Sequence, residues 1–236
     1  MELNLERHWV SHDTGSRRPL KVRGSRAAQS FARWLSQRRV TPNQISIMSV
    51  GFALLAAACL LALPHLGEIL SEDSVSVAHC IVSLMAAVFI QGRLLCNLFD
   101  GMVAVEGGKA TKAGELYNDI PDRLSDPIIL IAAGYSTEVV SWAPVLGWAA
   151  ALAAVGTAYV RTLAASLGAP VDFGGPMAKQ HRMAWMTLAC VVLAAAPWAS
   201  PLRWVMVVTL AVILVGSMYT SARRARAAAI ALQSSD

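Results

Sequence analysis

Long uncharged stretches alternate with short polar segments along this chain. The stretches cover residues 40–67, 74–92, 139–160, 183–202 and 204–222. A membrane-spanning helix needs about 20 mostly apolar residues, so each stretch is long enough to cross a bilayer. A shorter apolar segment, 127–137, becomes long enough if its helix begins near Gly114. The pattern predicts an all-α integral membrane protein with about six transmembrane helices in one membrane domain, residues 41–222.

The first forty residues differ from this pattern because they are basic and contain no long apolar run. Four apolar residues recur at helical spacing near the end of this segment: Ala27, Phe31, Trp34 and Leu35. The spacing favours an N-terminal amphipathic juxtamembrane helix with its basic face toward anionic headgroups. A solvated basic tail is the alternative interpretation. No signal-peptide core is present in the segment, so no cleaved leader is expected.

The charges of the loops predict the topology. With the N-terminus in the cytoplasm, one side of the membrane receives segment 1–40, Lys109, Lys112, the loop at Lys179 and the short basic tail 223–236. The positive-inside rule therefore places both termini and the polar stretch 97–126 in the cytoplasm. The protein is expected to be an integral multi-pass protein of the bacterial inner (cytoplasmic) membrane.

The composition supports the membrane interpretation. Of the 236 residues, 56% are hydrophobic and only 15% are charged, whereas a soluble domain carries roughly 25% charged residues. The formal net charge of +5 follows from the loop asymmetry, so it does not indicate a nucleic-acid partner.

Carboxylates and amides gather in the polar stretch 97–126. Asn97 and Asp100 lie three residues apart and share a helix face. The next predicted helix carries a stripe at four-residue steps, with two flanking carboxylates: Gly114, Asn118, Asp122 and Asp126, flanked by Glu115 and Asp119. Because the connection is short, the two helices are expected to be antiparallel neighbours with facing polar sides. Such oxygen ligands suit Mg²⁺ or Mn²⁺, which commonly bridges to substrate phosphates.

The spacing of these residues resembles the signature of the CDP-alcohol phosphatidyltransferases, D-x2-D-G-x2-A-R-x8-G-x3-D-x3-D. The chain has Asn97-x2-Asp100-Gly101-x2-Ala104-Val105-x8-Gly114-x3-Asn118-x3-Asp122. The segment Thr41-Pro42-Asn43-Gln44-Ile45-Ser46 also resembles the T-P-N-x-I-T sequence at the start of that family's first span. The six-helix plan of the family covers nearly the whole chain.

The resemblance implies an enzyme of phospholipid biosynthesis. It would transfer a phosphatidyl group from CDP-diacylglycerol to an alcohol and release CMP, with Mg²⁺ or Mn²⁺ as cofactor. The implied metal-site positions are Asn97, Asp100, Asn118 and Asp122, of which Asp122 would also be the general base. The implied nucleotide-binding positions are Asp100, Gly101, Ala104 and Gly114. Gly101 and Ala104 are also typical of close helix packing in membranes.

Three positions depart from the family pattern. Asn97 and Asn118 stand in place of carboxylates, and Val105 stands in place of Arg. An amide oxygen ligates a hard cation without adding charge, so a weaker metal site is expected unless Glu115 and Asp119 supply the charge. The paired asparagines resemble a bacterial subgroup of the family, which favours a variant enzyme. The alternative is an inactive relative that binds CDP-lipid as a scaffold.

A second motif overlaps with the first. Asn118-Asp119-x2-Asp122-x3-Asp126 matches the N-D-x2-D-x3-D motif of membrane prenyltransferases. Those proteins have a second acidic motif, but the only aspartates that follow Asp126 in this chain are Asp172 and Asp236, so a second such motif is missing. A prenyltransferase is therefore the less favoured interpretation.

Basic residues near the predicted cytoplasmic ends of the helices form a candidate phosphate site. Arg161, Lys179 and Arg182 are expected to bind the phosphate of an acceptor such as glycerol phosphate or inositol phosphate. A purely topological role is the alternative. Arg93 precedes Asn97 by one turn, and it is a candidate counter-charge, lipid-phosphate contact or interfacial side chain. The expected partners are CDP-diacylglycerol, the acceptor and membrane lipids, with a homodimer left open.

Overall fold

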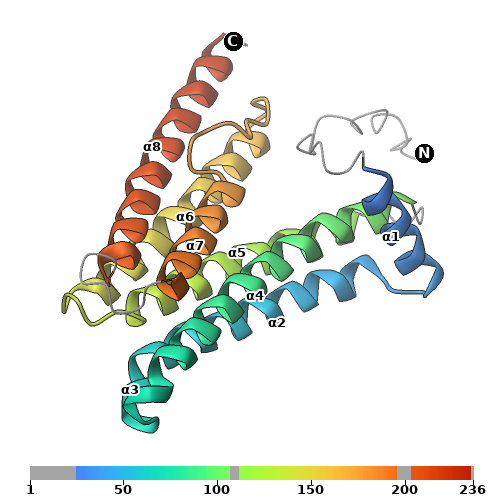
Figure 1. Ribbon diagram of the computed structural model, residues 1–236. Coiled ribbons are helices and arrows are strands. Elements are labelled where there is room, and N and C mark those ends of the chain that lie inside the picture. Colours follow the sequence, from blue (N-terminus) through green and yellow to red (C-terminus); the bar gives the residue numbers. More distant parts are fainter. Residues whose placement is uncertain (1–24, 107–111, 196–202, 235–236) are drawn as a thin grey trace, which may run out of the picture.

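The computed structural model describes residues 25–106, 112–195 and 203–234, without the side chains at positions 72, 73, 106, 112–115 and 118. The described residues form helices and no β-strand. In chain order the elements are α1 (Arg26–Gln37), α2 (Pro42–Ala62), the short 3-10 helix η2 (Leu63–His65), α3 (Leu66–Ile69), α4 (Glu72–Glu106), α5 (Lys112–Tyr135), α6 (Ala143–Ser166), α7 (Lys179–Ala195) and α8 (Val205–Gln233). The all-α prediction is confirmed (Figure 1).

Local sequence explains where the first two helices begin. The Ser25 hydroxyl accepts a hydrogen bond from the Ala28 amide at 3.2 Å and caps α1. Thr41 and Gln44 form a capping box at the start of α2, where Pro42 occupies the first turn. These contacts satisfy amide groups that have no partner within the helix. The segment at Thr41 therefore acts as a helix start.

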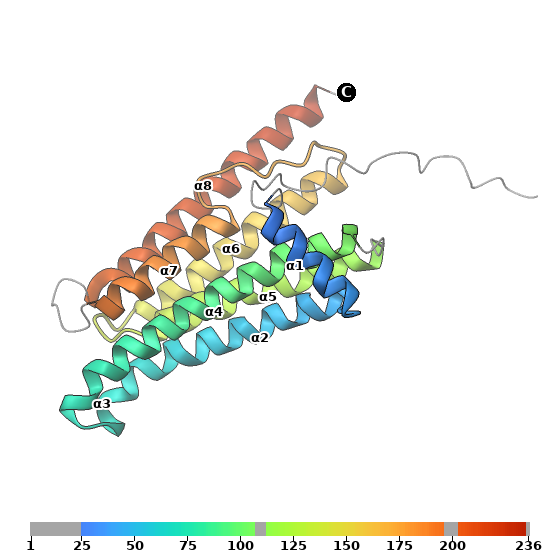
Figure 2. The ribbon, with the colours of Figure 1, turned by 45° about the vertical axis from the view of Figure 1, so that its right-hand side comes forward.

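Six long helices close into a ring. Helix α2 packs on α4, α4 on α7, α7 on α8, α8 on α6, α6 on α5, and α5 again on α2. Helices α4 and α5 run antiparallel (Figures 1 and 2), but their backbones approach each other closely at few positions. Polar side chains, described below, span the space between them.

Helices α5 and α6 are in much closer contact. A Cβ atom added at Gly134 would lie 2.8 Å from the Ala143 carbonyl oxygen, and one added at Gly147 would lie 2.8 Å from the Leu130 carbonyl oxygen. A side chain has no room at either position, so glycine permits the backbones to touch, as small residues do between membrane helices.

Within the described residues, four helical segments are long and apolar enough to cross a membrane: Pro42–Ile69, Ser74–Val105, Ala143–Ser166 and Val205–Gln233. The other two helices of the ring differ because α5 is polar in its first half and the described part of α7 has 17 residues. Leu54, Val88, Leu152 and Val215 are each more than half exposed on these four segments. A wide apolar exterior indicates contact with lipid, and the chain is a multi-pass membrane protein.

Helix α1 packs across the end of α4 (Figure 2). Ala28 and Ala32 are buried there, and the ring centres of Phe31 and Phe99 lie 4.8 Å apart. Trp34 stays about half exposed on the outside. A helix is thus present in the predicted segment, whereas its position on the membrane surface stays a prediction.

Candidate active site

Two pairs of polar side chains bridge α4 and α5. Asn97 donates a hydrogen bond from Nδ2 to Asp122 Oδ1 at 2.6 Å. One turn earlier on α4 and one turn later on α5, the Arg93 guanidinium lies 2.7 Å from Asp126 Oδ1. Arg93 and Asn97 are four residues apart on α4, as are Asp122 and Asp126 on α5. The two pairs lie opposite each other because the helices are antiparallel. The polar faces meet as predicted, although side chains rather than backbones make the contact.

Asp100 is buried near the end of α4. Its Oδ2 atom accepts a hydrogen bond from Ser46 Oγ at 2.7 Å, and its Oδ1 atom accepts one from the Gly101 amide at 2.5 Å. Ser46 lies on α2, so the segment that starts this helix also orients a motif carboxylate. In the sequence, Ser46 is the last residue of the motif at Thr41, and no role was predicted for it. The hydroxyl at the last position of that motif was the available signal.

Asp122 is the most heavily contacted carboxylate between the two helices. Its Oδ1 atom accepts the bond from Asn97 and lies 3.5 Å from Arg93 Nη2, while its Oδ2 atom pairs with the Lys179 ammonium. The side chain is 19% exposed, so solvent or a small substrate group reaches it.

Lys179 is the first residue of α7 and precedes the apolar part of that helix. Burial is the main cause that lowers the pKa of the Lys179 ammonium to about 8, and the charge of Arg93 acts in the same direction. The carboxylates of Asp122 and Asp126 oppose this change. These two carboxylates therefore favour the charged form of the lysine, and Asp122 contacts it directly.

A buried ion triad of Arg93, Asp126 and Arg182 lies beneath Asp122. Arg182 donates to Asp126 Oδ2 from Nε at 3.2 Å and from Nη2 at 2.7 Å. Its Nη1 atom donates to Thr157 Oγ1 at 3.1 Å and to the Met177 carbonyl oxygen at 2.9 Å. The triad joins α4, α5 and α7, and Arg182 connects it to α6 and to the loop before α7. Arg93 is fully buried, which rules out the interfacial position considered for it.

A second set of charges lies at the rim of the site. Asp119 is 2.9 Å from Arg123 Nη2 and 3.5 Å from Arg161 Nη2. Arg123 also donates to Thr162 Oγ1 at 2.8 Å, and the Arg161 guanidinium lies 5.4 Å from the Phe173 ring centre. Arg123 was not identified from the sequence, where an arginine between motif carboxylates was the only signal.

The three residues predicted to bind an acceptor phosphate do not form one cluster. Arg161 lies at the rim with Asp119, Lys179 pairs with Asp122, and Arg182 belongs to the buried ion triad. Lys179 and Arg182 both approach the α5 carboxylates, while Arg161 approaches the same helix one turn earlier.

Several predicted positions fall outside the description. Gly114, Glu115 and Asn118 belong to α5, but their side-chain surroundings are not described, and Lys109 lies outside the described residues. Ala104 is buried in α4, and Val105 is 62% exposed.

In the part of the chain that the structure describes, no group of three or more His, Cys, Asp or Glu side chains is placed to hold a metal ion. Asn97 supplies an amide where the family pattern has a carboxylate.

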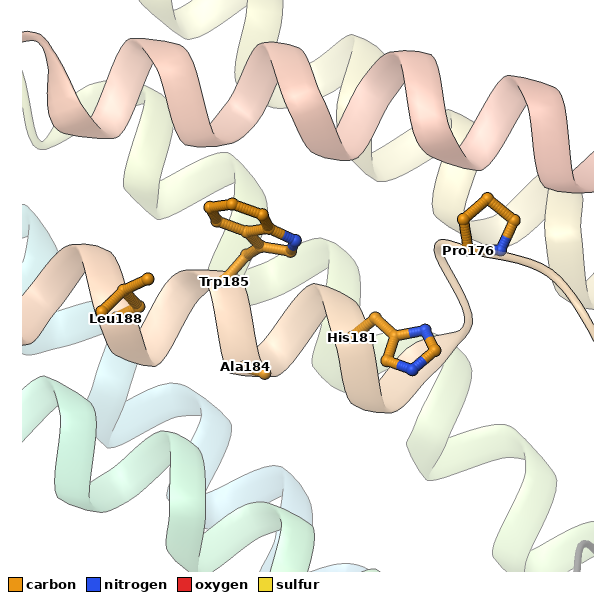
Figure 3. A pocket seen from close by; sticks show the side chains of 5 residues that line it. All are labelled: Pro176, His181, Ala184, Trp185 and Leu188. Carbon is orange, nitrogen blue, oxygen red and sulfur yellow. The ribbon is translucent and has the colours of Figure 1, made fainter.

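A shallow cavity of about 290 Å³ lies elsewhere, on α7 and the loop before it (Figure 3). Its lining is mainly apolar: Pro176, His181, Ala184, Trp185 and Leu188. None of the predicted site residues lines this cavity, so it is separate from the polar centre.

The ring of helices with a polar centre defines an α-helical integral membrane protein with a site between its helices. Solved structures with a similar fold include phosphatidylinositol phosphate synthase PgsA1 of Mycobacterium tuberculosis. The structure with CDP-DAG bound has a TM-score of 0.68 and 18% identity, covering 86% of this chain and 94% of that chain. The complex with manganese and citrate has a TM-score of 0.67 and 18% identity, covering 85% and 88%.

The apo form of PgsA1 has a TM-score of 0.63 and 17% identity, covering 84% of this chain and 94% of that chain. These structures share the fold of this chain. The fold expected from the resemblance to the CDP-alcohol phosphatidyltransferases is therefore confirmed. No protein-family model and no curated protein sequence matches the chain.

Proposed function

We propose that the protein is a CDP-alcohol phosphatidyltransferase of phospholipid biosynthesis. It transfers a phosphatidyl group from CDP-diacylglycerol to an alcohol and releases CMP. The observation that carries this proposal is the hydrogen bond between Asn97 and Asp122, which joins the two halves of the family motif across α4 and α5. The fold similarity to PgsA1 with CDP-DAG bound supports the choice of donor.

The donor atoms of the site suit a hard divalent cation. Asp100 and Asp122 would hold Mg²⁺ or Mn²⁺ together with the amide oxygens of Asn97 and Asn118, and the two carboxylates balance the charge of one such ion. The bound cation would neutralise the diphosphate of the donor. Asp119 already faces two arginines, so Glu115 is the better candidate for an additional charge. The manganese complex of PgsA1 supports the use of a divalent metal.

Asp122 is the proposed general base. It takes the proton of the acceptor hydroxyl while the acceptor oxygen forms a bond to the β-phosphorus of the CDP-lipid. The bond between that phosphorus and the bridging oxygen of the diphosphate breaks, and CMP leaves with the electron pair. Lys179 occupies Asp122 Oδ2 before substrate binds, so the acceptor hydroxyl has to displace its ammonium.

The proposed acceptor is a phosphorylated alcohol. Arg161 contacts Asp119 and Lys179 contacts Asp122, and these two carboxylates lie about one turn apart on α5. An acceptor phosphate would attract both cations and draw Lys179 away from Asp122. Arg182 is 4% exposed and already fully engaged, which favours an indirect contribution. Since PgsA1 is a phosphatidylinositol phosphate synthase, inositol phosphate is the first acceptor to test.

The proposed membrane arrangement keeps the six predicted spans. Helices α5 and α7 would complete the four apolar segments, with the polar half of α5 and the start of α7 at the cytoplasmic surface. The termini would lie on the same side, because the basic residues of segments 1–40 and 223–236 follow the positive-inside rule. Domain 41–222 would then contain the entire reaction site.

Release of CMP tests the proposal. The purified protein in lipid vesicles is supplied with CDP-diacylglycerol, Mg²⁺ or Mn²⁺, and a panel of free and phosphorylated alcohols. We expect metal-dependent CMP release with a phosphorylated acceptor, a higher acceptor KM in Arg161→Gln, and little change in the control Arg223→Gln. Binding of CDP-diacylglycerol without CMP release for any acceptor would instead support the scaffold alternative.

A further inference from the structure

Arg93 has the largest fully buried side chain among the described residues. A buried cation is expensive unless it is paired and hydrogen-bonded. Because Arg93 is fully buried next to the proposed base Asp122, the positive-inside rule for loops does not explain its position.

The contacts of Arg93 use a single nitrogen. Nη2 lies 2.7 Å from Asp126 Oδ1, 3.5 Å from Asp122 Oδ1 and 3.4 Å from the Asp122 carbonyl oxygen. Nε and Nη1 have no hydrogen-bond partner within the described residues. A buried donor without a hydrogen-bond partner destabilises the folded protein. The guanidinium thus contacts both aspartates through Nη2, while its other nitrogens make no hydrogen bond within the described residues.

Asp126 does not depend on Arg93 alone for its counter-charge. Arg182 already places two nitrogens on Asp126 Oδ2, at 3.2 and 2.7 Å. With Lys179 also present, three cations face the two carboxylates Asp122 and Asp126. The positive charge of Arg93 is therefore available to Asp122.

The geometry points to Arg93 as a positioning residue for Asp122, an inference that rests on the proposed function. Arg93 and Asn97 both approach Oδ1 of Asp122. Oδ2, now paired with Lys179, is left as the oxygen that faces the acceptor. Arg93 thereby fixes the carboxylate plane and selects Oδ2 as the atom that takes the proton.

Two substitutions test this role. Arg93→Lys keeps the charge, but its side chain is one bond shorter, so its nitrogen does not reach the position of Nη2 between the two aspartates. We expect kcat for CMP release to fall about 10-fold in Arg93→Lys and about 100-fold in Arg93→Gln, since small misplacements of a reacting group have effects of this order. The KM values for donor and acceptor should change less than about 3-fold, because Arg93 is too deeply buried to bind either substrate directly.

Arg224→Lys is the matched control. Arg224 is also buried, but it donates to the carbonyl oxygens of Gly174 and Thr157. We expect this control to change the melting temperature at least as much as Arg93→Lys while kcat stays within about 2-fold of the unsubstituted protein. If the Arg93→Gln protein does not fold, Arg93→Gln combined with Asp126→Asn keeps the net charge of the triad and should show the same loss of kcat.

A double-mutant cycle separates positioning from general structural damage. If Arg93 acts through Asp122, Arg93→Lys should cause no further loss in an Asp122→Asn background, measured by single-turnover CMP release. A kcat for Arg93→Lys equal to that of the unsubstituted protein, or an undiminished effect in the Asp122→Asn background, would overturn the inference alone. Absence of CMP release by the unsubstituted protein would instead remove the proposed function and this inference with it.

Discussion

Helix α5 makes two opposite kinds of contact with its neighbours. Toward α6, Gly134 and Gly147 bring two backbones together without any side chain between them. Toward α4, the backbones stay apart, and hydrogen bonds and ion pairs from Asp122 and Asp126 span the gap. One helix thus packs closely at some positions and carries the candidate site at others. Close packing fixes its location, and the wider space holds the polar side chains of the candidate site.

The two contacts also use different parts of α5. The first half of the helix carries the polar stripe, and its second half, from Pro127 onward, is apolar. Both Pro121 and Pro127 lie inside the helix, and Ser125 donates its hydroxyl to the Pro121 carbonyl oxygen at 2.8 Å. The division means that substitutions on the α4 side should affect turnover, whereas those on the α6 side should affect stability.

The largest effect is expected at Asp122. Asp122→Asn retains the shape of the side chain but removes the base, so turnover should fall about 10³-fold. The fold should be retained because the side chain is isosteric, while the melting temperature should fall somewhat because Arg93 and Lys179 lose a counter-charge. Initial rates of CMP release and thermal unfolding in detergent measure the two quantities. Retained turnover would exclude Asp122 as the base.

The α6 side is tested by a matched pair of glycine substitutions. Gly147→Ala places a methyl group against the Leu130 carbonyl oxygen, whereas a Cβ atom at Gly51 meets no atom within 4 Å. We expect Gly147→Ala to lower the free energy of unfolding by about 1–3 kcal/mol and Gly51→Ala to leave it unchanged or raise it. Turnover per folded molecule should stay constant in both. Equal melting temperatures would argue against backbone contact between α5 and α6.

Asn97→Asp tests the contact between α4 and α5 as a metal site. The new carboxylate would face Asp122, so without metal the two charges should repel each other and lower the melting temperature. Binding of Mn²⁺ should become about 10-fold tighter, which corresponds to about 1.4 kcal/mol. The measurement is the melting temperature as a function of Mn²⁺ concentration, with Asn43→Asp as a charge-matched control. The same Mn²⁺ response in both variants would contradict a metal site at Asn97.

The smallest effect is expected at Ser46, whose hydroxyl orients Asp100 from a third helix. Ser46→Ala should reduce turnover about 5-fold, because only part of the about 1.5–3 kcal/mol that a hydrogen bond to a charged group contributes should be lost in the reaction. Ser49→Ala is the control, because Ser49 is buried on the same helix but donates to the Ser46 carbonyl oxygen. If both variants show equal turnover, the Ser46 bond has no part in the reaction.

Sequence patterns predicted the elements better than the contacts between them. The uncharged stretches located the long helices, and four-residue steps placed Asp122 and Asp126 on one face of α5, because helix period and hydrophobicity are local properties. The same reasoning grouped Arg161, Lys179 and Arg182 by their positions near the predicted cytoplasmic ends of the helices. In the structure these residues approach different carboxylates, since each leaves its helix in a direction that depends on the neighbouring helix.

Arg93 illustrates the limit most clearly. The sequence left three roles open for it, because a basic residue one turn from Asn97 can face lipid, solvent or the interior. Its burial and its contacts with two aspartates depend on how α4 and α5 are turned toward each other. The residues within one turn of Arg93 in the sequence do not determine how the two helices are oriented relative to each other.

The amino-acid sequence by itself determined the helical class, the membrane character and the spacing of the motif from Asn97 to Asp122. These follow from short-range periodicity and from the length of apolar stretches. Only the tertiary structure decided that Ser46 holds Asp100, that Lys179 covers Asp122 and that Arg93 lies beneath it. The physical reason is that these contacts join separate helices of a closed ring, and their geometry is set by which helices pack side by side.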